Sequence, residues 1–111
     1  MSRLASLLVL VMLFSIPLAR AIDADQFDEL EGYTVIACTH AAGELEGADF
    51  DKLVKLDNGM IFEFQTYSYF YDYRPAVVVF GKTLQYQGKS LTLYKLLIGD
   101  EDEIFDVIRV R

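Results

Sequence analysis

The sequence has few of the residues that usually stabilise small domains or carry out chemistry in them. Its 111 residues include one cysteine, Cys38, one histidine, His40, two prolines and no tryptophan. A single cysteine excludes an intramolecular disulfide, and a single histidine leaves any metal site dependent on carboxylates. No apolar period long enough for a substantial helix appears after the first thirty or so residues, which argues against a helical bundle.

Basic residues are also scarce. The chain has 10 lysines and arginines against 17 aspartates and glutamates, a formal net charge of −7. A surface this acidic repels nucleic acids and anionic lipid headgroups. We therefore predict no nucleic-acid partner.

The first 21 residues have the pattern of a secretory signal peptide. Arg3 precedes an apolar run from Leu4 to Leu18, and Ala19-Arg20-Ala21 fits the small-x-small cleavage rule. The run is shorter than the roughly 20 residues of a spanning helix, which disfavours the alternative of an uncleaved anchor. We predict a periplasmic or secreted protein without stable membrane insertion after removal of residues 1–21.

The remaining chain is organised as a short leader and one β-domain. Residues 22–31 carry five acids and no base, and Phe27 and Leu30 allow one amphipathic turn ended by Gly32. Residues 32–111 alternate between β-branched or aromatic segments and short turns, without a crossover helix. The expected extended segments are 33–39, 50–56, 60–66, 67–74, 76–80, 83–87, 91–98 and 104–110. Gly81-Lys82 closes the segment 76–80, and a turn at Gly88 joins 83–87 to 91–98 as a second hairpin. This pattern predicts an all-β fold, a small antiparallel barrel or roll of five to six strands.

The Asn58-Gly59 pair predicts a β-hairpin. Both central positions of a type I′ turn need positive φ, which asparagine and glycine tolerate. A two-residue turn here predicts that Lys55 lies opposite Phe62 and that Leu53 lies opposite Phe64. Both faces of the hairpin are then partly apolar, which suits a small closed barrel.

A tyrosine recurs at every second residue in one segment, at Tyr67, Tyr69, Tyr71 and Tyr73. A period of two places the four rings on one face of a strand. Such a row either packs against the neighbouring hairpin as part of the core or forms a platform for a ligand. Because aromatic residues dominate small cores, we expect the packed arrangement, while the row remains the leading candidate for ligand binding.

Cys38 and His40 lie two residues apart and share a face of the expected strand 33–39. A histidine beside a cysteine can favour the nucleophilic thiolate. No third residue that would orient the histidine can be named, however, and Val35, Ile36 and Ala37 precede the cysteine. We therefore expect Cys38 to be a buried apolar residue and His40 to be exposed at the strand end.

Acidic residues offer no specific ligand set. Asp100 to Glu103 form a four-acid run that could bind calcium weakly, yet it lacks the alternating Asp-x-Asp-x-Asp-Gly spacing of calcium loops. A charged, solubilising turn is the favoured interpretation. Paired carboxylates could also serve a glycosidase, but nothing selects one pair among 17 acids. We predict neither a metal nor a cofactor.

Several segments resemble a group of small bacterial proteins to which no activity is assigned. They are Gly43-Glu44-Leu45-Glu46-Gly47, then residues 55–62, the Tyr-x-Tyr-x-Tyr-x-x-Pro stretch that ends at Pro75, and Val77-Val78-Val79. The likeness covers roughly Gly43 to Phe80, departs from the pattern at Leu45, where an aromatic is expected, and is less clear in the carboxy-terminal half. It implies a bacterial protein with an SH3-like β-barrel.

Together these observations predict a non-catalytic binding or accessory module of the cell envelope. The tyrosine row would bind an unidentified protein, peptide or glycan ligand. One alternative is a small thiol-dependent enzyme that uses Cys38 and His40. Another is a partner subunit that donates an edge strand to a second protein.

Overall fold

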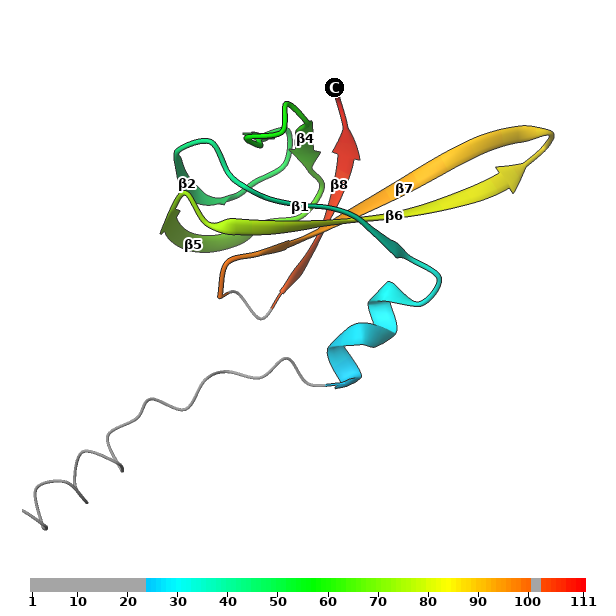
Figure 1. The fold of residues 1–111 in the computed structure, drawn as a ribbon, viewed down its shortest axis with the longest axis horizontal. Coiled ribbons are helices and arrows are strands. Elements are labelled where there is room, and N and C mark those ends of the chain that lie inside the picture. The colour runs from blue at the N-terminus through cyan, green and yellow to red at the C-terminus, as the bar shows by residue number, and fades with distance from the viewer. Residues whose placement is uncertain (1–23, 101–102) are drawn as a thin grey trace, which may run out of the picture.

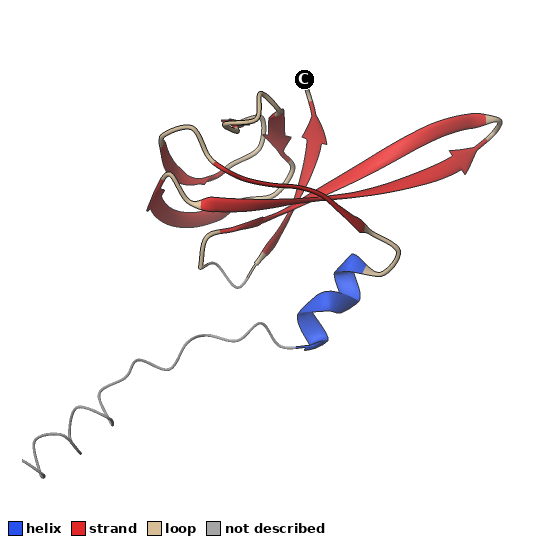
Figure 2. Cartoon of the chain, in the orientation of Figure 1, coloured by secondary structure: helices blue, strands red, loops and turns tan. Residues whose placement is uncertain are grey.

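The computed structural model describes residues 24–100 and 103–111 (Figure 1). The predicted signal peptide and residues 101–102 of the acidic run lie outside these ranges. The described chain forms one short 3₁₀ helix and eight strands (Figure 2). They are η1 (Ala24–Leu30), β1 (Thr34–His40), β2 (Glu44–Ala48), β3 (Leu53–Lys55), β4 (Ile61–Phe64), β5 (Ser68–Tyr73), β6 (Ala76–Tyr86), β7 (Lys89–Ile98) and β8 (Ile104–Arg109).

All strand pairs are antiparallel, which confirms the predicted all-β antiparallel class. Six strands form one curled sheet in the order β1-β6-β7-β8-β4-β3, and β2 and β5 form a separate two-stranded ribbon (Figure 1). The described residues thus contain more strands than the five to six predicted. The main sheet alone has six strands, and the ribbon adds two more, of which β2 was not among the expected strands.

The two edges of the curled sheet approach each other next to the start of β2. Ala41, which follows β1, forms an isolated bridge with Leu56, which follows β3. The amide of Ala42 donates to the carbonyl of Lys55, and the amide of Asp57 donates to the carbonyl of His40, both at 2.9 Å. These few hydrogen bonds draw the sheet into a half-barrel.

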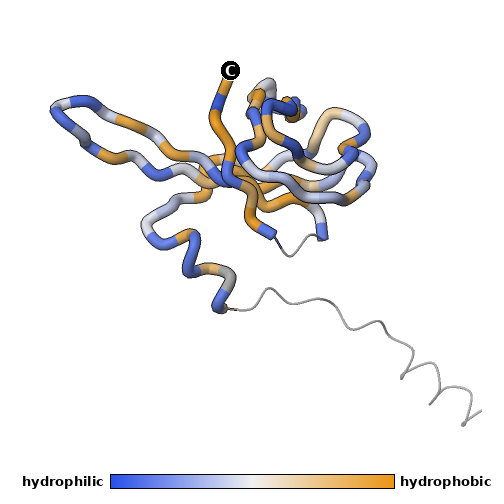
Figure 3. Tube along the Cα trace, turned by 180° about the vertical axis from the view of Figure 1, so that it is seen from behind, coloured by the Kyte–Doolittle hydropathy of each residue, from blue (hydrophilic) through white to orange (hydrophobic). Residues whose placement is uncertain are grey.

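The interior is filled by apolar side chains from the concave face of the curled sheet and from the ribbon. Figure 3 shows that hydrophobic positions follow the central strands, whereas the helix and the tip of the β6–β7 hairpin are largely hydrophilic. Phe105 of β8 lies at the centre, with its ring centroid 5.6 Å from that of Phe64 and 5.4 Å from that of Phe70. The largest fully buried side chains are Phe62, Phe64, Phe105, Leu96, Ile98, Val77 and Val79.

The hairpin at Asn58-Gly59 is present, but its predicted register is wrong by one residue. Lys55 pairs with Ile61, and Val54 pairs with Phe62. Gly59 has φ of +91°, whereas Asn58 does not have positive φ, and the amide of Gly59 donates to the carbonyl of Leu56. The loop is therefore a three-residue turn closed by glycine, and the extra residue turns Val54 and Phe62 together into the core.

Strand β6 is longer than predicted, because Gly81 does not end it. The strand continues to Tyr86 and pairs with β7 over its whole length, from Val77 opposite Ile98 to Tyr86 opposite Lys89. A two-residue turn at Gln87 and Gly88, with φ of +50° and +77°, joins the two strands. The hairpin predicted around Gly88 is confirmed, and its distal half projects from the sheet (Figure 1).

Helix η1 lies in the segment predicted as an acidic leader. Leu30 is buried and Phe27 is exposed, so the predicted amphipathic turn attaches through only one of its two apolar residues. Gly32, with φ of +81°, follows the helix as expected. Beyond it the ring of Tyr33 lies near two ammonium groups, at 5.7 Å from Lys82 and 5.5 Å from Lys95. These cation–π contacts fix the helix end to the β6–β7 hairpin.

Candidate functional site

The four tyrosines of the row are exposed, so the expectation that they pack against the hairpin is wrong. The exposed fraction of the residue is 65% for Tyr67, 92% for Tyr69, 62% for Tyr71 and 67% for Tyr73. Between them Phe70, whose side chain points to the opposite face of β5, is buried against Phe105. The interior thus contains the phenylalanine, and the tyrosines form an outward aromatic row along β5 and at Tyr67, the residue before it.

Strand β2 places two carboxylates beside this row. Glu44 pairs with Tyr73, and Glu46 pairs with Tyr71, and residues that pair directly across an antiparallel ladder project from the same face. Leu45 lies between the two glutamates, points inward and is buried. We call the surface formed by Tyr67, Tyr69, Tyr71, Tyr73, Glu44 and Glu46 the tyrosine face.

One hydrogen bond orders the tyrosine face. The hydroxyl of Tyr71 donates to Oε1 of Glu44 at 3.0 Å. This bond, followed by the negative charge of Glu44, raises the pKa of Tyr71 above its ordinary value of 10.0. Tyr71 therefore stays a neutral donor over the physiological range, and its hydroxyl is held at the carboxylate of Glu44.

A glycine bulge sets the position of these glutamates. The pairing of β2 with β5 shifts register between Glu46 and Ala48, at Gly47, which has φ of +74°. A Cβ atom on Gly47 would lie 2.8 Å from the carbonyl oxygen of Ser68. The close backbone approach therefore depends on glycine at this position.

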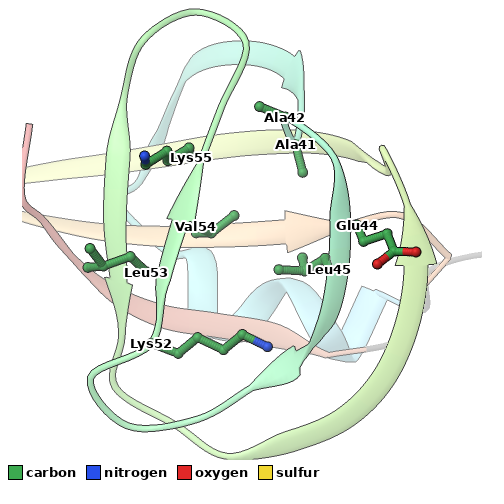
Figure 4. A pocket seen from close by; sticks show the side chains of 8 residues that line it. All are labelled: Ala41, Ala42, Glu44, Leu45, Lys52, Leu53, Val54 and Lys55. Carbon is green, nitrogen blue, oxygen red and sulfur yellow. The ribbon is translucent and has the colours of Figure 1, made fainter.

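A shallow pocket adjoins the tyrosine face at the gap between β2 and β3. Its volume is about 220 Å³, and its lining residues are Ala41, Ala42, Glu44, Leu45, Lys52, Leu53, Val54 and Lys55 (Figure 4). Lys52 extends across the gap (Figure 4). Its ammonium donates to the carbonyl of Glu46 at 2.6 Å. Glu44 is therefore shared between the pocket and the tyrosine face.

Comparison of the chain with protein families, curated proteins and solved structures finds no match.

The positions of Cys38 and His40 do not form a catalytic centre in the described structure. Both residues lie on β1, an edge strand, and Cys38 is exposed, so its predicted burial is wrong. The inward positions of this part of β1 are taken by Ala37 and Thr39 instead. Within residues 24–100 and 103–111, no hydrogen bond or ion pair orients the imidazole of His40.

The described residues contain no group of three or more His, Cys, Asp or Glu side chains able to hold a metal ion. Asp100 and Glu103, the ends of the acidic run that the structure describes, are exposed. Among these described residues, no helix has both the length and the apolar character needed to cross a bilayer.

One carboxylate pair was not identified from the sequence. Glu63 of β4 pairs with Leu53 of β3, which brings it to the carboxyl group of Asp51. Their hydrogen bond is the main cause that raises the pKa of Glu63 above its ordinary value of 4.5. Only the correct hairpin register places the two acids together. Their direct contact is closer than the spacing of about 5 Å or more found in glycosidases.

This pair predicts a pH dependence of unusual sign for a carboxyl group. Because the pKa of Glu63 is higher in the folded than in the unfolded state, the folded state binds this proton more tightly. The contribution to stability is present below pH 4.5 and is lost as the pH rises through the raised pKa. An NMR titration should show the midpoint of Glu63 falling in the variant Asp51→Asn. An unchanged midpoint would mean that Asp51 is not the cause.

Proposed function

We propose that the protein is a non-catalytic binding module of the cell envelope, periplasmic or secreted, whose contact surface is the tyrosine face. The exposure of all four rings of the row supports this proposal, because soluble domains rarely leave a contiguous aromatic surface without a partner. The resemblance to small bacterial proteins and the curled antiparallel sheet are consistent with an SH3-like barrel, which we propose as the detailed architecture.

The charges of the tyrosine face favour a positively charged ligand. Among the described residues neither Glu44 nor Glu46 forms an ion pair, so the negative charges of both carboxylates are uncompensated, although Glu44 accepts the hydrogen bond of Tyr71. Exposed tyrosine rings attract ammonium and guanidinium groups through cation–π contacts. Alternating rings along one strand also match the repeat of an extended chain. We therefore propose that the ligand is an extended peptide segment rich in lysine or arginine.

The proposal predicts that hexalysine binds to the purified protein and that binding weakens with salt. The double variant Tyr69→Ser/Tyr71→Ser should weaken binding roughly tenfold, because two cation–π contacts are lost. The double variant Glu44→Gln/Glu46→Gln should weaken it similarly and flatten the salt dependence. Isothermal titration calorimetry at two salt concentrations measures both effects.

The control is Tyr86→Ser, which removes a tyrosine of the same exposed fraction as Tyr73, 67%, from a distant hairpin. Its affinity should equal that of the unchanged protein. Hexaglutamate should not bind. If a chitin or cellulose oligosaccharide binds and hexalysine does not, the ligand of the tyrosine face is a glycan and not a basic peptide. If the double tyrosine variant binds the same probe as tightly as the unchanged protein does, the tyrosine face is not the contact surface.

A further inference from the structure

The distal half of the β6–β7 hairpin is a two-stranded arm with two free backbone edges. We define the arm as residues 82–93. The pairing of β1 with β6 ends at Thr34 opposite Gly81, and the pairing of β7 with β8 ends at Tyr94 opposite Val107. Beyond these points no strand of the described chain covers either edge, and Figure 1 shows the arm projecting away from the sheet.

The arm is amphipathic. One face carries Lys82, Leu84 and Tyr86 on β6 and Lys89, Leu91 and Leu93 on β7, and the leucines and the tyrosine are exposed. The other face is polar, with hydrogen bonds between Thr83 and Thr92 at 3.3 Å and between Gln85 and Ser90 at 2.8 Å. A two-stranded ribbon with one apolar face is marginally stable in water, so this arrangement favours an additional strand at one edge.

The charges of the chain favour a second copy at this position. The 17 acids of the sequence are absent from the whole stretch between Asp72 and Asp100. Two copies therefore repel each other over most of their surfaces and least at the arm. The positive charge of Lys82 is also engaged, since its ammonium donates to the carbonyl of Glu31 at 3.3 Å and lies over Tyr33.

The hairpin register fixes which backbone groups are free on the β6 edge. In a hairpin with a two-residue turn, the pair next to the turn, here Tyr86 and Lys89, is hydrogen-bonded, and alternate pairs follow. Thr83 and Gln85 therefore direct their amide and carbonyl groups away from β7. Gly81, the next residue in this alternation, is already opposite Thr34 of β1.

We propose that the protein dimerises by antiparallel pairing of the β6 edges of two arms, about a twofold axis at Leu84. This register places Thr83 opposite Gln85 of the partner subunit and uses all four free groups of each edge. It is self-complementary, as a twofold interface requires. Leu84 meets Leu84 of the partner subunit, and the aliphatic stem of Lys82 packs against the ring of Tyr86 of the partner subunit.

The β7 edge is less suitable. Its outward groups belong to Ser90 and Thr92, so the equivalent twofold pairing is centred on Leu91. That register places Lys89 opposite Leu93 of the partner subunit. The aliphatic side chain of leucine offers the ammonium group neither a counter-charge nor an aromatic ring. The β6 pairing instead converts two marginal ribbons into one four-stranded sheet in the order β7-β6-β6-β7.

Sedimentation equilibrium under reducing conditions, which prevent a disulfide through the exposed Cys38, tests this proposal. The protein without residues 1–21 should form a dimer with a dissociation constant in the micromolar range. Gln85→Pro should weaken the dimer at least about tenfold, because it removes an outward amide from each copy without breaking a backbone hydrogen bond to β7. It also removes the side-chain hydrogen bond between Gln85 and Ser90. The matched control Ser90→Pro makes the same change on the opposite edge and should leave the dimer unchanged.

Leu84→Lys, which places like charges together at the axis, should also give a monomer, and circular dichroism should confirm that all three variants are folded. The proposal is overturned if the unchanged protein is monomeric at hundreds of micromolar, or if Ser90→Pro disrupts the dimer as strongly as Gln85→Pro. If such a monomer binds to phosphatidylglycerol vesicles, the arm contacts a lipid surface and not a second copy of the chain.

Discussion

Replacement of Phe105 by alanine is expected to lower the free energy of unfolding by about 4 kcal/mol. The side chain is fully buried, and its ring contacts Phe64 of the main sheet and Phe70 of the ribbon. Its removal leaves a cavity between two aromatic rings that belong to different sheets. Urea unfolding measured by circular dichroism gives the change.

Tyr69→Ala provides the control, because Tyr69 is an aromatic residue on the outward face of the ribbon. Its free energy of unfolding should stay within about 0.5 kcal/mol of the unchanged protein. Similar losses for Phe105→Ala and Tyr69→Ala would show that the ribbon is oriented differently. The tyrosines would then be packed, and the proposed contact surface would be wrong.

Replacement of Gly47 by alanine is expected to cost about 3 kcal/mol. Alanine at the φ of +74° found for Gly47 loses about 1 kcal/mol from backbone strain alone. The added Cβ would also lie 2.8 Å from the carbonyl oxygen of Ser68, so β2 must move away from β5. We expect the same variant to lose the hydrogen bond between Tyr71 and Glu44, detectable as chemical shift changes along β2 and β5.

Gly88→Ala separates strain from the close backbone approach. Gly88 has φ of +77°, nearly the same as Gly47, but nothing lies within 4 Å of the position of its Cβ. Its cost at low protein concentration should be about 1 kcal/mol. Equal costs for the two glycines would contradict a steric role for the bulge.

The sequence predicted the class of fold because that prediction depends on local patterns. β-branched segments, an absent helical period and turn residues are sufficient for an antiparallel fold. Register is less local. Asn58-Gly59 predicts a turn equally well whether the loop has two residues or three, and the choice depends on which side chains the finished core accepts. Phe62 and Val54 are buried together, and this requirement selects the longer loop.

The orientation of the tyrosine row depends on a contact that the sequence does not reveal. The β5 segment has aromatic residues on both faces, so periodicity alone gives two equivalent orientations. Phe70 is buried because Phe105, distant in sequence, lies beneath it. Glu44 and Glu46 belong to the tyrosine face for a similar reason: their pairing with Tyr73 and Tyr71 joins two segments separated by the β3–β4 hairpin.

Two further errors come from reading single residues as signals. Gly81 suggested a strand end, yet its missing side chain serves close packing, since a Cβ there would lie 3.3 Å from Ile36. Cys38 suggested burial because of its apolar neighbours, but β1 has a bulge at Ile36 that changes which residues face inward. Neither packing nor bulges can be inferred from composition.

The place of β8 in the sheet has a consequence for how the protein folds. β8 is the last of the described strands in sequence order, yet it lies between β7 and β4, and the amide of Ile61 donates to the carbonyl of Arg111 at 2.9 Å. While the ribosome is still making the chain, β4 and β3 therefore have no connection to the rest of the main sheet through β8. Pairings this distant in sequence form slowly. The sheet therefore lacks this strand, and its native strand order, until all the other described strands have been synthesised.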